Sequence, residues 1–161
     1  MATIKTGIMA VAALLLLASC DEKRVFDEYK ELDGWQKDST LTFNYEAADS
    51  TQLYNVFVTT RTNNSYPYSN IFLIVHMEQP GTKLIQADTL EYQMANPDGT
   101  LMGSGFSDVK ESKLWYKENI KFPKKGKYKF SIQQAVRKAN EIPGVQQLEG
   151  VTEVGLRIEK K

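Results

Sequence analysis

The stretch Ile71-Phe72-Leu73-Ile74-Val75 decides the fold class, because it is apolar at every position. A strand with one face in water alternates apolar and polar residues, whereas a short continuous apolar run is typical of a strand covered on both faces. After residue 20, no long stretch repeats apolar residues at helical spacing. We therefore predict that residues 71–75 form a central, doubly covered strand of an all-β domain.

Shorter runs on either side of this strand alternate with a period of two. Leu41, Phe43 and Tyr45 share one face of a first strand, and residues 54–60 are rich in β-branched and aromatic side chains. Alternation returns at 90–94 and at 154–159, and turn signals such as Gln79-Pro80-Gly81-Thr82 lie between the runs. This pattern predicts a single antiparallel β-sandwich, Ig-like or jelly-roll-like.

Two local features complete the predicted sandwich. Residues 114–122 and 128–132 flank the turn Pro123-Lys124-Lys125-Gly126, which predicts a β-hairpin with a four-residue loop. We also expect a helical turn near residues 107–112.

The N-terminal 20 residues have a different character from the rest of the chain. Lys5 is their one charge, and an apolar run from residue 8 to residue 18 follows it. A basic start, a short apolar stretch and small residues at its end predict a cleaved secretory signal peptide. The run is too short for a transmembrane helix, which needs about 20 apolar residues.

The end of this segment, Leu17-Ala18-Ser19-Cys20, resembles a bacterial lipobox, in which the Cys is acylated and becomes the mature N-terminus. The alternative is a buried free Cys in the N-terminal helix of a cytoplasmic protein. We favour lipidation of Cys20, with two or three acyl chains giving a stable anchor. The predicted domains are a signal peptide (1–19), a lipidated N-terminus and tether (20–37) and the β-sandwich (38–161).

The composition limits the chemistry that the chain can perform. Its 161 residues include 20 Lys+Arg, 20 Asp+Glu, one Cys and one His, a balance that excludes a typical nucleic-acid binder and a Cys-rich or multi-His metal site. His76 and Glu78 share a strand face but lack further metal ligands, and Gly103-Ser104-Gly105 lacks the spacing of a phosphate loop or nucleophile elbow. We therefore predict no enzyme activity, no cofactor and no metal.

The sequence also contains one candidate sugar-binding surface and three candidate glycosylation sites. Trp35, Trp115, Tyr116, Tyr66 and Tyr68 could form a platform for sugar rings, although such residues more often pack in the core of a sandwich. Three short runs, Asp38-Ser39-Thr40, Asp49-Ser50-Thr51 and Asp88-Thr89-Leu90, resemble the O-glycosylation acceptor of Bacteroidota. They make Ser39, Ser50 and Thr89 candidate glycosylation sites.

Longer motifs spread over nearly the whole mature chain resemble the GldH gliding-motility lipoproteins of Bacteroidota. In chain order they are Arg24-Val25-Phe26-Asp27-Glu28-Tyr29, Gly34-Trp35, Asn70-Ile71-Phe72-Leu73, Asp88-Thr89-Leu90-Glu91, Pro97-Asp98-Gly99, Gly105-Phe106-Ser107-Asp108-Val109-Lys110, Leu114-Trp115-Tyr116-Lys117, Gln133-Gln134-Ala135-Val136-Arg137 and Leu148-Glu149-Gly150-Val151-Thr152-Glu153-Val154-Gly155.

The resemblance implies a non-catalytic lipoprotein associated with the outer membrane, in a gliding apparatus linked to type IX secretion. It carries over one functional residue, Cys20, and implies other envelope proteins as partners. The acidic pair Asp21-Glu22 after Cys20 resembles a surface-export signal of Bacteroidota, and which face of the outer membrane the protein occupies stays open. The alternative function is a surface glycan-binding lipoprotein, which rests on the loop aromatics and on the sandwich shape.

Overall fold

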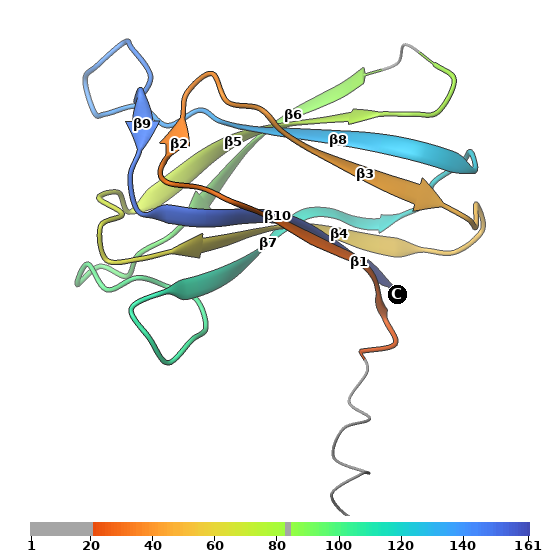
Figure 1. The fold of residues 1–161 in the computed structure, drawn as a ribbon, viewed down its shortest axis with the longest axis horizontal. Helices are drawn as coiled ribbons and strands as arrows, with labels where there is room; N and C mark the ends of the chain where they lie inside the picture. The colour runs from red at the N-terminus through yellow and green to blue at the C-terminus, as the bar shows by residue number, and fades with distance from the viewer. Residues whose placement is uncertain (1–20, 83–84) are drawn as a thin grey trace, which may run out of the picture.

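The computed structural model describes residues 21–82 and 85–161, and ten β-strands make up its regular structure (Figure 1). Among the described residues there is no α-helix. The strands are β1 (Arg24–Glu31), β2 (Trp35–Gln36), β3 (Leu41–Ala47), β4 (Tyr54–Thr62), β5 (Asn70–Glu78), β6 (Ile85–Gln93), β7 (Lys110–Ile120), β8 (Gly126–Gln134), β9 (Gln147–Leu148) and β10 (Val151–Lys160).

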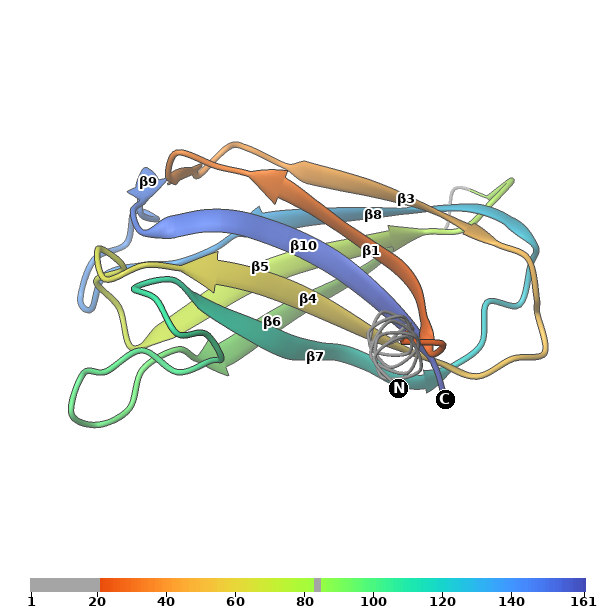
Figure 2. The ribbon, with the colours of Figure 1, turned by 60° about the horizontal axis from the view of Figure 1, so that its bottom comes forward.

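Two four-stranded sheets form the two layers of the domain. The first, sheet A, has the order β1-β10-β4-β7, and the second, sheet B, has the order β3-β8-β5-β6; β2 and β9 form a small ribbon at one end. Every strand pair is antiparallel. Figure 2 shows the two layers, and together these features confirm the predicted antiparallel β-sandwich.

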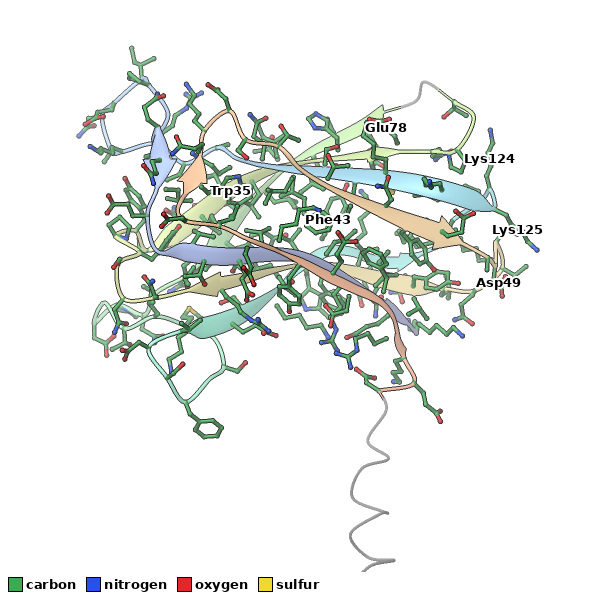
Figure 3. The ribbon with its side chains drawn as sticks, viewed as in Figure 1. Trp35, Phe43, Asp49, Glu78, Lys124 and Lys125 are labelled. Carbon is green, nitrogen blue, oxygen red and sulfur yellow. The ribbon has the colours of Figure 1, made fainter. Side chains whose placement is uncertain are left out.

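The core lies between the sheets and is built from alternate residues of each strand. Val56 and Val58 of β4, and Leu73 and Val75 of β5, are fully buried there. Figure 3 shows Phe43, on the first predicted strand, between the two layers. The alternation at 41–45, 54–60 and 154–159 thus falls on strands, as predicted, and the run at 90–94 coincides with the end of β6, which stops at Gln93.

A cluster of aromatic rings fills the core at one end of the sandwich. Phe122 is fully buried, and its ring centroid lies 5.1 Å from that of Tyr45, 5.2 Å from Tyr54, 4.7 Å from Tyr128 and 6.4 Å from Phe130. These residues come from β3, β4, β8 and the β7–β8 connection, so the cluster ties the two sheets together.

The predicted hairpin around Pro123-Lys124-Lys125-Gly126 is wrong. Strand β7 pairs with β4 in sheet A, and β8 pairs with β3 and β5 in sheet B, so the connection crosses from one layer to the other. Buried Phe122 starts the crossing, and the backbone N–H of Lys124 donates a hydrogen bond to the Tyr128 hydroxyl at 3.1 Å. Figure 3 shows Lys124 and Lys125 at the end of the domain.

Two further predictions need correction. Strand β5 has the expected inner position in its sheet, but within residues 71–75 only Ile71, Leu73 and Val75 are buried, because the opposite face of sheet B has no covering layer. The helical turn expected near residues 107–112 is absent: residues 106–108 form a bend, and β7 begins at residue 110.

The segment expected to be a tether contains a strand of the sandwich. β1 pairs with β10 along its length, from Arg24 opposite Glu159 to Glu31 opposite Glu153. The buried side chain of Trp35, from β2, also lies inside the domain (Figure 3). The sandwich therefore includes β1 and Trp35 from the segment expected to be a tether.

Candidate functional site

The candidate modification residues lie in three separate segments. Cys20 is outside the described residues. Ser39 and Ser50 are half-buried in the connections before and after β3, whereas Thr89 is exposed on β6. The structure does not bring Ser39, Ser50 and Thr89 together.

The candidate sugar platform is largely buried. Trp35, Tyr66 and Tyr116 belong to the core, while Trp115 is 53% exposed. Tyr66 and Tyr68 lie at 78° to one another with centroids 6.0 Å apart, so they do not present a flat row of rings. The structure therefore gives the glycan-binding alternative no stacking surface from these five residues.

His76 and Glu78 lie on the outer face of sheet B and are half-buried. A Glu78 carboxylate oxygen accepts an ion pair from Lys129 Nζ at 2.7 Å on the neighbouring strand. In the part of the chain that the structure describes, no three His, Cys, Asp or Glu side chains are grouped so that they could hold a metal ion.

The outer face of sheet A carries the densest arrangement of polar and aromatic contacts, which the sequence alone did not reveal. Strand β4 is buried on both faces here: Val58 points into the core, while Phe57 and Thr59 lie buried on the other side. Register places Phe57 beside Arg157 of β10 and Trp115 of β7. Side chains of the neighbouring strands β7 and β10 therefore cover the outer face of β4.

A first cluster on this face surrounds Arg61. Its Nε lies 2.9 Å from Glu111 Oε2, its Nη1 bonds Glu153, and its guanidinium carbon lies 4.5 Å from the centre of the Tyr29 ring. The two carboxylates raise the pKa of Arg61 above its ordinary value. The Arg61 side chain from β4 thus links β7 and β10 through two ion pairs, and it also packs over the Tyr29 ring from β1.

A second cluster surrounds Arg157, nearer the start of the described chain. Arg157 Nη2 lies 2.8 Å from Asp21 Oδ2, and its Nε lies 2.6 Å from Glu159 Oε1. Glu159 also accepts an ion pair from Lys113 Nζ at 2.7 Å. Burial alone would raise the pKa of Glu159, but the bonds from Lys113 and Arg157 outweigh it and hold the pKa below its ordinary value.

An aromatic pair connects this cluster to the edge strand β7. The rings of Phe57 and Trp115 lie 4.4 Å apart at 54°, and Lys113 Nζ lies 4.0 Å from the centre of the Phe57 ring. Trp115 and Lys113 therefore shield Phe57 from water, while the indole itself stays half in solvent.

The loop before β7, residues 101–109, borders the same face. Gly103 and Gly105 adopt positive φ, and Ser104 and Glu111 exchange backbone hydrogen bonds of 2.8 and 2.9 Å. The tip of this loop holds Phe106 fully exposed. A hollow of about 550 Å³ lies between the loop and the Arg61 cluster.

Some sequence signals for this face exist, although they are weak. In β10 a charged residue alternates with core residues, as in Leu156-Arg157-Ile158, and in β4 the polar Thr59 follows the core residue Val58. The pairing that makes a site is not visible, since Arg61 and Glu153 are 92 residues apart in the chain. Among the described residues, the structure has no helix of the length and apolar character needed to cross a membrane.

Comparison with known proteins places this sandwich among relatives of similar length. The GldH lipoprotein family model matches residues 24–158. The chain is 60% identical over 157 residues to the gliding motility lipoprotein GldH of Flavobacterium johnsoniae, covering 97% of this chain and 96% of that protein. It is 54% identical over 150 residues to a GldH homolog of Christiangramia forsetii, covering 93% and 92%.

Among solved structures, a fructofuranosidase from Schwanniomyces occidentalis matches with 10% identity and a TM-score of 0.40, over 89% of this chain and 35% of that enzyme. This similarity is too low to support an inference about activity. The sequence matches, in contrast, cover β1 to β10 almost completely. The chain belongs to the GldH family of gliding-motility lipoproteins.

Proposed function

We propose that this protein is a non-catalytic lipoprotein of the outer membrane that is held by acyl chains on Cys20 and supports gliding by binding other envelope proteins. The observation that carries the proposal is the 60% identity to a gliding motility lipoprotein over 97% of this chain. The signal-like N-terminus ending in Leu17-Ala18-Ser19-Cys20 supports the anchor.

The family match to proteins named as gliding-motility lipoproteins supports the non-enzymatic part of the proposal. His76, the one histidine of the chain, lies on an open sheet face with Glu78, whose carboxylate is paired with Lys129. The ion pairs on the outer face of sheet A join strands to one another.

The anchor is tested by replacing Cys20 with Ser in the native host and measuring the intact mass of the mature protein, its membrane fraction and colony spreading. We expect Cys20→Ser to lose the acyl mass, the membrane association and gliding. Ser19→Ala keeps a small residue before the Cys and is the matched control. A Cys20→Ser protein that stays acylated or supports normal spreading would overturn the proposed anchor.

The binding of envelope proteins is tested by cross-linking a tagged chain in intact cells, followed by purification and mass spectrometry. We expect defined envelope proteins in the cross-linked product. Recovery of glycan alone would favour the alternative function. Protease treatment of intact cells assigns the face of the membrane, with digestion expected for a surface-exposed domain and protection for a periplasmic one.

We further propose O-glycosylation at Ser39, Ser50 or Thr89. Exposure of Thr89 on β6 makes it the most accessible of the three, because the other two are half-buried. Mass spectrometry of peptides from the native host tests this: hexose-type additions that disappear in Thr89→Ala support modification there. Unmodified peptides at all three positions would refute it.

A further inference from the structure

We propose that the outer face of sheet A, together with the Phe106 loop, lies against the lipid bilayer that holds the acyl chains. This inference rests on the proposed lipidation of Cys20. It adds an orientation, namely which surface of the domain meets lipid, and it names Phe106 and Trp115 as the side chains in contact.

The first argument is the place where the described chain begins. Cys20 directly precedes Asp21, and adjacent Cα atoms are about 3.8 Å apart. Asp21 is fixed on sheet A by its 2.8 Å ion pair with Arg157 and by the 3.0 Å hydrogen bond from the Arg24 N–H to the Asp21 carbonyl. Lipid attached to an acylated Cys20 therefore starts one residue away from this face.

The side of the sheet is set by Arg157. Its neighbours in the chain, Leu156 and Ile158, are fully buried in the core, so Arg157 lies on the opposite, outer face. Figure 1 shows the described chain leaving β1 on this side, away from sheet B. The bilayer is consequently adjacent to sheet A and distant from sheet B.

The second argument is the distribution of exposed apolar side chains. Four large apolar residues are exposed in the described parts of the chain, and three of them, Met102, Phe106 and Trp115, lie on β7 or the loop before it. That loop borders the outer face of sheet A beside Arg61 and Glu153. In Figure 1 the segment leading into β7 projects below sheet A, as the start of the chain does.

The chemistry of these side chains suits the membrane interface. Trp is enriched where one end of the ring is apolar and the other is wet, and an exposed Phe gains from insertion among acyl chains. Lys113 lies over Phe57 beside Trp115, so the exposed indole is the apolar group of this pair of rings that faces outward.

The three cations that lie on this face, Arg61, Lys113 and Arg157, are already paired with carboxylates of the protein. Arg157 and Lys113 pair with Asp21 and Glu159, and Arg61 pairs with two glutamates. Contact therefore depends on apolar insertion near the anchor and not on attraction to anionic lipid. We expect it in vesicles of phosphatidylethanolamine and phosphatidylcholine, with little dependence on salt.

The contact is tested with the full acylated protein reconstituted in such vesicles. Phe106→Cys, labelled with an environment-sensitive fluorophore, is compared with Ile142→Cys. Acylation blocks the native Cys20 thiol, so each variant has one reactive Cys. Ile142 is also highly exposed, but it lies beside Ile74 and Gln133 on the sheet B side of the domain. We expect a blue shift and a severalfold rise in emission at 106, quenched by brominated lipid, and no change at 142.

Flotation of the same samples separates the two hypotheses. Protein that floats without a change at 106, or with equal changes at both positions, overturns the orientation and leaves the anchor intact. Protein that fails to float overturns the anchor and the orientation with it. A change at 106 that occurs only after envelope proteins are added overturns lipid contact in favour of a protein partner. Loss of lipid quenching in Trp115→Phe, with buried Trp35 as the remaining fluorophore, supports the contact without an attached label.

Discussion

The aromatic ring of Tyr29 lies over Gly155, where the outer face of sheet A has no side chain of its own. A Cβ built at Gly155 would lie 2.9 Å from Tyr29 Cδ1, 2.8 Å from the Glu28 carbonyl oxygen and 2.4 Å from Thr59 Oγ1. The ring thus fills the gap that a strand glycine leaves, and it also supports the Arg61 guanidinium.

Gly155→Ala is therefore expected to destabilise the domain. The added methyl group would contact backbone as well as side-chain atoms, and such overpacking costs about 1–3 kcal/mol. Urea unfolding measures the loss. Gly144→Ala is the matched control, because its Cβ would meet the flexible end of Lys37 at 3.2 Å and the free energy of unfolding should change by less than about 0.5 kcal/mol. Equal effects in the two variants would contradict the close packing at Gly155.

The ring cluster at the sheet crossing gives a second prediction. Phe122→Ala removes a fully buried ring that contacts four others, and such truncations cost about 3–5 kcal/mol. Thermal and urea unfolding should both shift strongly. Lys121→Ala, at the exposed neighbouring position, should stay within about 0.5 kcal/mol of the native protein. A small effect of Phe122→Ala would contradict the burial of this ring among the four others.

The sequence predicts most strands of this fold but not their partners. Alternation in residues 41–45 or 54–60 shows that a segment is a strand with one buried face. It carries no information on which sheet the strand joins, so the 114–122 and 128–132 segments were indistinguishable from a hairpin. Phe122 is the one sequence signal against a hairpin. An aromatic residue directly before a predicted turn indicates that the chain passes through the core there, and Phe122 is buried between the two sheets.

Strand β1 escaped prediction because of its composition. Five of the eight residues in Arg24–Glu31 are charged, which is typical of an edge strand protected from pairing with other chains. Its side chains are at most half-buried, so the alternation is weak. The candidate site on sheet A depends on this strand and on pairs such as Arg61 with Glu153, and so it required the register that only the structure provides.

The two tryptophans should differ sharply in their contribution to stability. Trp35 is fully buried and its Nε1–H donates to the Ser39 carbonyl at 3.0 Å, so Trp35→Ala should cost about 3–5 kcal/mol. Trp115 is half-exposed and makes one ring pair with Phe57, so Trp115→Ala should cost about 0.5–1.5 kcal/mol. Urea unfolding of both variants checks the order, and similar losses would contradict the burial described for Trp35.

Glu159 makes the stability of the domain depend on pH. Its pKa in the folded protein is held below the ordinary value of 4.5 by Lys113 and Arg157, against the opposing effect of burial. A carboxyl whose pKa is lower in the folded state stabilises it above the unfolded-state pKa and loses that contribution as the pH falls through the folded-state value. The contribution is therefore complete at neutral pH and is lost in acid, below about pH 4.5.

Glu159→Gln is expected to be less stable than the native protein at neutral pH, and the difference should shrink as the pH is lowered to about 3. Unfolding in urea across this pH range measures both curves. Glu118→Gln, at an exposed position of β7, is the control and should follow the native curve. A difference in the free energy of unfolding between Glu159→Gln and the native protein that stayed constant with pH would contradict this prediction. It would mean that Lys113 and Arg157 do not stabilise the Glu159 carboxylate, and that the ion pairs of the second cluster do not contribute to stability.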